Sequence, residues 1–148
     1  MTICANKRKY LFGNIVNDEM ALSEYGKIVE NVWYNLTGHY QNIKLDKFIV
    51  MPNHIHGIII LMDMDDVGAG FKPAPTDLTK YYPLSEIVRA FKTFSARHVN
   101  ELRITPGIPV WQRNYHEHIV RNENELNRIR EYIMNNPLRW QFDRENSD

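Results

Sequence analysis

The sequence predicts an α+β protein, with an antiparallel sheet covered by helices that pack mainly on one of its faces. Three observations lead to this prediction. Short apolar runs are joined in pairs by turn-forming residues, as in β-hairpins. Two longer stretches, near 23–38 and 84–102, repeat apolar residues every three or four positions, as amphipathic helices do. The order strand, hairpin, helix, hairpin, helix, strand, helix is typical of such a sheet.

The beginning of the chain supplies a strand, a hairpin and a helix. A short strand is predicted over 2–5, and a hairpin over 11–22, because Asn17 and Asp18 at its centre tolerate positive φ. Ser23 is placed to cap a helix that ends at or near Gly38. The apolar stripe of this helix must pack on the sheet, and consists of Tyr25, Ile28, Val29, Val32, Trp33 and Leu36.

The next two strands, 44–51 and 54–62, meet at Pro52 and Asn53, which central strands avoid. His54 and His56 stand at the head of the second strand. Because alternate residues of a strand point to one face, the two imidazoles project side by side and can hold one metal ion. A histidine in an apolar strand is also common as a core residue that hydrogen-bonds the backbone, so this pattern alone leaves both interpretations open.

The second half begins with residues 63–82, which lack periodicity and predict a surface loop. A helix over about 84–102 is expected to bury one side. A strand is predicted over 110–121, and a last helix from a cap at Asn122 to about residue 135, before Pro137. The expected buried side of the 84–102 helix comprises Ile87, Val88, Phe91, Phe94, His98 and Val99, with His98 in a structural role.

The bulk composition is that of a water-soluble domain. With 148 residues, 43% hydrophobic and 24% charged, we expect one domain over 1–148. No apolar stretch approaches the roughly 20 residues of a membrane span, and no signal peptide is recognisable, so we expect a cytoplasmic protein and no membrane partner. The single cysteine, Cys4, cannot form an internal disulfide and is interpreted as a small hydrophobic residue of the first strand.

The charge balance gives the molecule no overall field that would attract phosphates, since the net charge is zero and the pI is near 7.0. A nucleic-acid partner would therefore need a local basic patch. Such a patch is present in the 80–103 stretch, although a run of this kind is also typical of a solvated helix face. Its members are Lys80, Arg89, Lys92, Arg97 and Arg103, opposed by Glu86 and Glu101.

Several motifs together resemble the single-tyrosine HUH transposases, most strongly the REP-associated tyrosine transposases. They cover nearly the whole chain in order. The motifs are Met51-Pro52-Asn53-His54-Ile55-His56-Gly57, Val110-Trp111-Gln112-Arg113 with Tyr115 and Glu117-His118, and Tyr132-Ile133 followed by Asn135-Asn136-Pro137. Near the N-terminus, Thr2-Ile3-Cys4, Leu11-Phe12-Gly13 and Glu24-Tyr25-Gly26 also match that subgroup.

The resemblance implies a ferredoxin-like sheet and a metal-dependent single-stranded DNA endonuclease and strand transferase. Tyr132 would be the nucleophile that forms a 5′-phosphotyrosine, and His54 and His56 the metal ligands. Asn136 would be a third ligand or support the metal, with His118 and Gln112 as supporting residues. The family implies Mg²⁺ or Mn²⁺, whereas two imidazoles alone would suit Mn²⁺, Zn²⁺ or Co²⁺ better than Mg²⁺.

The resemblance also implies a homodimer that takes single-stranded DNA folded into a hairpin. Contacts to such DNA combine basic side chains on phosphates with stacking on exposed aromatic rings. Related proteins carry a longer basic N-terminus, and we expect this gripping arm to be missing here. The candidates for phosphate contacts are Arg89, Lys92, Arg97, Arg113, Arg121 and Arg128.

Two alternatives remain open at this point. His116-Glu117-His118 is a second His-x-His on a predicted strand, and if it met His54 and His56 the four imidazoles and the glutamate could form a hydrolytic zinc site. Alternatively, the fold binds hairpin DNA or RNA without performing chemistry on it.

Overall fold

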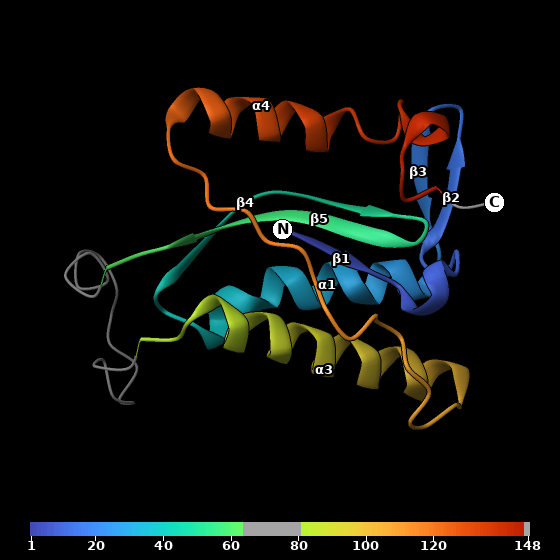
Figure 1. Ribbon diagram of the computed structural model, residues 1–148. Coiled ribbons are helices and arrows are strands. Elements are labelled where there is room, and N and C mark those ends of the chain that lie inside the picture. Colours follow the sequence, from blue (N-terminus) through green and yellow to red (C-terminus); the bar gives the residue numbers. More distant parts are fainter. Residues whose placement is uncertain (64–80, 147–148) are drawn as a thin grey trace.

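The computed structural model describes residues 1–63 and 81–146 and confirms the α+β class (Figure 1). Most of the loop predicted over 63–82 lies outside the described residues. The strands are β1 (Thr2–Cys4), β2 (Gly13–Val16), β3 (Glu19–Leu22), β4 (Ile43–Met51) and β5 (His54–Leu61). The helices are α1 (Glu24–His39), α3 (Leu84–Arg103) and α4 (Glu123–Met134), with short 3-10 helices η1 (Asn6–Arg8) and η2 (Trp140–Phe142).

The strand that carries the two histidines, β5, lies in the middle of an antiparallel sheet with the order β1-β5-β4. His56 is opposite Thr2 on one side and Ile49 on the other. β2 and β3 make up the predicted hairpin, which is a sheet of its own. Its turn residues Asn17 and Asp18 have φ of 52° and 60°. The sequence-based prediction of positive φ at this turn is therefore confirmed.

Helices lie on both faces of the sheet, but mainly on one (Figure 1). The pair α1 and α3 covers one face, and α4 alone runs along the other. The predicted caps are present, since Ser23 Oγ accepts a hydrogen bond from Gly26 N at 3.1 Å and Asn122 Oδ1 accepts one from Glu125 N at 2.8 Å. No helix in the described part of the chain is long and apolar enough to cross a membrane.

The core between the sheet and α1 centres on Trp33, which is fully buried. Its ring stacks on Phe48 with centroids 4.3 Å apart. On β5 the indole lies against Gly57, where a Cβ atom would come within 2.4 Å of the Trp33 ring. Only glycine fits at this point of β5. The face of β5 that carries Gly57 therefore packs directly against α1.

The strand predicted over 110–121 is not a regular strand. This segment pairs with the start of the chain through two isolated bridges, His116 with Thr2 of β1 and Trp111 with Ala5, the residue after β1. The segment has more residues between these bridges than β1 has, so its middle bulges away. Its carbonyl groups turn instead to the Lys92 ammonium, which donates to the oxygens of Gln112, Arg113 and Asn114 at 2.8, 3.0 and 3.4 Å.

The buried stripe of α3 also differs from the prediction. Phe94 is 39% exposed, and the His98 side chain is 53% exposed and pairs with Glu101 at 3.5 Å. Ser95 is buried instead, because its hydroxyl accepts a hydrogen bond from the Trp111 indole N–H at 2.9 Å. Ser95, a polar residue with a buried hydrogen-bond partner, therefore lies on the buried side of α3, where hydrophobicity had predicted Phe94 and His98.

Candidate active site

The two histidines of β5 point to the face that α4 covers, and they lie against each other. His54 is fully buried and His56 is 7% exposed. Their Nε2 atoms are 3.0 Å apart, and the rings meet edge to face with centroids at 4.6 Å. The prediction that alternate strand positions bring the two imidazoles side by side is confirmed.

The orientation of the His54 ring is set by Asn53. The Asn53 amide nitrogen donates to the backbone oxygens of Glu145 at 2.6 Å and Arg8 at 3.4 Å, which fixes Oδ1 as the acceptor. Oδ1 lies 2.8 Å from His54 Nδ1, so Nδ1 carries the ring proton and donates it. The His54 Nε2 lone pair is therefore directed at the space beside His56, which is how ligand histidines are held in metal sites.

The His56 ring is held in the same manner by the strand beside it. Its Nδ1 is 2.8 Å from the Thr2 hydroxyl on β1, and the hydroxyl oxygen can accept a hydrogen bond from Nδ1–H. Burial lowers the pKa of His54 to about 4, and burial together with the charge of His54 lowers the pKa of His56 to about 2. Both rings are therefore neutral at neutral pH, the form in which imidazole binds metals.

Two oxygen donors lie near the imidazole pair. Asp143 Oδ2 is 3.8 Å from His54 Nε2, and the donor atoms of His54, His56 and Asp143 all lie within 4.8 Å of one another. Asn136 is 2% exposed and lies beside His54. Its Oδ1 is buried without a hydrogen-bond partner of ordinary length among the described residues, which is unusual for a buried amide oxygen.

These donors fit a divalent metal ion. Two nitrogen ligands with bonds of about 2.1 Å that subtend a right angle lie about 3 Å apart, as the two Nε2 atoms do. The neutral imidazoles, the Asp143 carboxylate and the orphaned Asn136 oxygen together make a mixed nitrogen and oxygen set. Such a set suits Mn²⁺ or Zn²⁺ better than Mg²⁺, which prefers oxygen alone.

Tyr132 is on α4 and its ring lies against that of His56. Its ring centroid is 5.4 Å from that of His56 at an interplanar angle of 65°, and the residue remains 44% exposed. The helix ends at Met134, so Asn136 lies just beyond it rather than one full helical turn after Tyr132. The Asn136 amide nevertheless folds back, and Nδ2 reaches the Tyr132 carbonyl oxygen at 3.5 Å.

Residues after α4 complete the site. Trp140 stacks on His54 with centroids 5.9 Å apart and an interplanar angle of 29°. Asp143 follows directly after η2, and its side chain is only 4% exposed. No pattern in the sequence points to Asp143 or Thr2 as neighbours of the histidines, whereas Asn53 is part of the motif and could have been considered.

The residues predicted to contact phosphates do not share one surface. Arg89 and Arg97 are exposed on α3, on the opposite face of the sheet from α4 and Tyr132 (Figure 1). Arg128 is exposed on α4, and Arg121 is exposed just before it. Arg113 is exposed in the bulged segment, where the Lys92 ammonium is bonded to backbone oxygens rather than directed to solvent.

The second His-x-His does not join the first. In the described part of the chain, the cluster that could hold a metal contains His54, His56 and Asp143, but neither His116 nor His118. His118 pairs with Glu125 at the start of α4. The four-imidazole zinc site is therefore wrong. Two residues, His118 and Gln112, were expected to support the site. His118 contacts Glu125 in the first turn of α4, and Gln112 donates its backbone N–H to Cys4 O at 2.8 Å.

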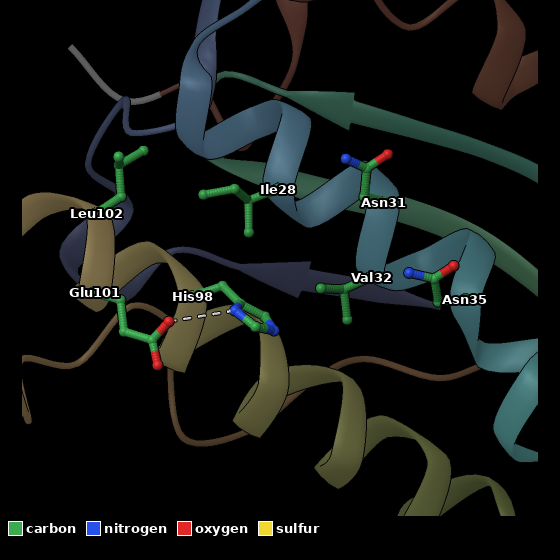
Figure 2. Close-up of a pocket in the computed structure, with 7 residues that line it drawn as sticks. All are labelled: Ile28, Asn31, Val32, Asn35, His98, Glu101 and Leu102. Carbon is green, nitrogen blue, oxygen red and sulfur yellow. Dashed lines mark ion pairs between the residues drawn. The ribbon is translucent and has the colours of Figure 1, made fainter.

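A groove lies between α1 and α3, away from the histidines (Figure 2). The His98–Glu101 ion pair faces apolar residues of α1 across it, including Ile28 and Val32. It lies on the face of the sheet opposite α4. The chemistry of the buried imidazole cluster, rather than this hollow, marks the candidate active site.

Comparisons with known proteins show the family and the fold of the chain. No family model matches the chain. An uncharacterized protein of Haemophilus influenzae is 36% identical over 97% of this chain and 81% of its own length. Among solved structures, a REP-associated tyrosine transposase bound to a REP hairpin superposes with a TM-score of 0.62 at 19% identity, over 96% of this chain and 67% of its own. The chain thus belongs to one family with the Haemophilus influenzae protein, and its fold is that of the REP-associated tyrosine transposases.

Proposed function

We propose that this protein is a metal-dependent endonuclease and strand transferase that cleaves single-stranded DNA at hairpins through a covalent 5′-phosphotyrosine. The observation that carries the proposal is the position of Tyr132, whose ring lies 5.4 Å from that of His56, beside two imidazole Nε2 atoms that face each other. The shared fold with a REP-associated tyrosine transposase supports it independently.

In this reaction the Tyr132 phenolic oxygen attacks the scissile phosphorus. A bond forms between that oxygen and phosphorus, the bond from phosphorus to the 3′ oxygen of the preceding nucleotide breaks, and the phenol proton passes to water. The departing 3′ oxygen takes up a proton and leaves as a hydroxyl. Because the phosphodiester energy is retained in the phosphotyrosine, a new 3′ hydroxyl can reverse the step and join another strand.

His54 and His56 would hold the divalent ion, with Asp143 and Asn136 as the oxygen donors beside them. When bound, the ion would supply positive charge to the scissile phosphate and orient it for in-line displacement. Mn²⁺ fits the donor set, and Mg²⁺ is the alternative that the family resemblance implies. The roles of Asn53 and Thr2 are to keep the two Nε2 lone pairs directed inward.

The DNA partner would be a single strand that carries a hairpin. Its phosphates would be contacted by exposed basic residues on the same side of the sheet as Tyr132, Arg128 on α4 and Arg121 just before that helix. Arg113, Arg89 and Arg97 would contact more distant phosphates, and Lys92 would hold the bulged segment from which Arg113 projects. A homodimer would place a second copy of these residues on the same DNA.

The test is covalent capture. The protein is incubated with a pool of labelled single-stranded hairpin oligonucleotides and Mn²⁺, resolved under denaturing conditions, and mapped by mass spectrometry. Wild type should form a protein–DNA adduct at Tyr132. Tyr132→Phe should form none while retaining DNA affinity within about twofold, because only the attacking oxygen is removed.

Tyr34→Phe is the matched control, since Tyr34 is 55% exposed on α1 and removal of its hydroxyl leaves the site intact. It should form the adduct at the wild-type rate. Adduct formation by Tyr132→Phe would overturn the assignment of the nucleophile. Tight hairpin binding by wild type without any adduct would favour a binding module instead.

A further inference from the structure

A bidentate ion pair joins α4 to the sheet close to Tyr132. Arg130 Nε donates to Asp46 Oδ1 at 2.8 Å and Arg130 Nη2 donates to Asp46 Oδ2 at 2.6 Å. The Asp46 side chain is 13% exposed and that of Arg130 34%, so the pair is partly shielded from water. Paired N–H donors on one carboxylate fix both distance and direction, which a single ion contact does not.

Both partners are held by their own elements as well. Asp46 is in the part of β4 where the pairing with β5 shifts, between Leu45 and Phe48, and its Oδ1 accepts the Lys47 N–H at 2.8 Å. Hydrogen bonding to Arg130 lowers the pKa of Asp46, so the carboxylate stays ionised. Arg130 Nη1 donates to Asn127 Oδ1, one turn earlier on α4, at 3.2 Å.

The apolar anchorage of α4 is small. Of its twelve residues only Ile133 is buried. Arg130 and Ile133 are three positions apart and therefore share the helix face that meets the sheet. Tyr132 is the residue before Ile133 and is itself 44% exposed. Leu126 and Ile129 are half-buried, so the apolar packing that resists rotation of α4 about its own axis rests on one fully and two partly buried side chains.

We propose that Asp46 and Arg130 act as a clamp that sets the rotation of α4 and thereby positions Tyr132 over His56. They are positioning residues, since neither contacts the reacting atoms. The inference rests on the proposed function for its kinetic consequence but not for its geometry. With side chains about 5–6 Å from the helix axis, a rotation of roughly 20° moves a side-chain tip by about 2 Å. Misplacement of about 1 Å can lower a catalysed rate roughly 100-fold.

The kinetic test compares Arg130→Lys and Asp46→Asn with wild type in the covalent capture assay with Mn²⁺ and hairpin oligonucleotides. Arg130→Lys keeps the positive charge but removes the pair of N–H groups that bind both oxygens of Asp46. Both variants should form the Tyr132 adduct roughly 10- to 100-fold more slowly at saturating DNA, while the DNA concentration for half-maximal rate changes by less than about threefold. Asp46→Arg and Arg130→Asp should each slow the reaction when made alone. The double variant that carries both should recover part of the lost rate, because the ion pair is restored with its charges exchanged.

Matched controls are Glu131→Gln, which alters an exposed charge next to Arg130, and Lys44→Gln, which alters an exposed charge on β4. Both should react at the wild-type rate. Circular dichroism verifies that every variant is folded at the assay temperature. Wild-type rates in folded Arg130→Lys and Asp46→Asn would overturn the clamp, and so would an equal loss of rate in the controls.

A second measurement does not depend on activity. The edge-to-face contact of His56 and Tyr132 should give NMR cross-relaxation between their ring protons in wild type and in Glu131→Gln. In Arg130→Lys these cross-peaks should weaken severalfold. If wild type forms no adduct, the proposed function fails and the clamp is decided by this comparison. Unchanged cross-peaks in Arg130→Lys would then reject it.

Discussion

The same three-residue pattern occurs twice in this chain and has two different structures. His54 and His56 are buried on a central strand, with Nε2 atoms 3.0 Å apart. His116 and His118 are exposed on an irregular segment, and His118 turns to Glu125 instead of to His116. The first pair has strands on both sides of it, whereas the second reaches β1 through an isolated bridge.

The surroundings of a His-x-His pattern determine whether its two imidazoles can act together. Each imidazole of the first pair has a partner on Nδ1, Asn53 for His54 and Thr2 for His56, and both partners come from neighbouring backbone that the sheet fixes. This leaves both Nε2 atoms directed inward. A histidine pair without such partners on Nδ1 is expected to bind a metal more weakly, since loss of one such partner lowers metal affinity about 10- to 100-fold.

The largest expected effect separates the two pairs directly. His54→Ala or His56→Ala should weaken Mn²⁺ binding by roughly 100-fold or more, because a proposed metal ligand is lost, and loss of only a residue that hydrogen-bonds a ligand already costs about 10- to 100-fold. His116→Ala and His118→Ala should leave the affinity unchanged. Isothermal titration with Mn²⁺ measures this. Equal losses at both pairs would show that the structural distinction has no bearing on metal binding.

The next effect concerns the partner that orients His54. Asn53→Ala should weaken Mn²⁺ binding about 10- to 100-fold while both histidines remain, since Nδ1 loses its acceptor and the ring its fixed tautomer. Asn35→Ala, an exposed amide on α1, should have no effect on the same titration. Wild-type affinity in folded Asn53→Ala would mean that burial alone orients the ring.

A smaller effect is expected from the oxygen donors. Asp143 lies beside the first histidine pair, and among the described residues no such cluster includes the second pair. Asp143→Asn should weaken Mn²⁺ binding about tenfold, because the carboxylate near His54 Nε2 is replaced by a neutral amide. Asp18→Asn, at the tip of the β2–β3 hairpin, is the charge-matched control and should titrate as wild type does. If Asp143→Asn binds as tightly as wild type, Asn136 is the relevant oxygen donor.

The smallest effect belongs to the second pair and appears in stability rather than in binding. Hydrogen bonds from the Arg121 backbone and from His118 lower the pKa of Glu125 below its usual 4.5. The ionised Glu125 therefore stabilises the start of α4 above that pH, and the contribution is lost as pH falls through the lowered value. Glu125→Gln should melt slightly below wild type at pH 7, and the difference in melting temperature should vanish as the pH falls through the lowered pKa of Glu125. A constant difference across that range would exclude ionisation as the cause.

The sequence was sufficient for the elements that carry their own local signals. Ser23 and Asn122 cap helices, Asn17 and Asp18 form the turn with positive φ, and the period of two brings the β5 histidines together. These features depend on neighbours in the chain. The fold class followed from the order of such elements.

Features that depend on distant contacts could not be predicted in the same way. Asp143 meets His54 from the far end of the chain, and no periodicity marks it. The alternation in 110–121 suggested a strand, but Lys92 on α3 binds the carbonyls that a strand would have paired. Ser95 is buried in α3 because Trp111 supplies a hydrogen-bond donor, which hydropathy does not register.

The contact between Gly57 and Trp33 has a consequence for variation in this family. The residue after His56 has no side chain because the indole occupies its place, so a single strand separates the aromatic core from the imidazole cluster. Any larger residue at position 57 requires either the Trp33 ring or β5 itself to move. The chemistry of one face is thus constrained by the size of an aromatic ring on the other, and substitutions at positions 33 and 57 should evolve together.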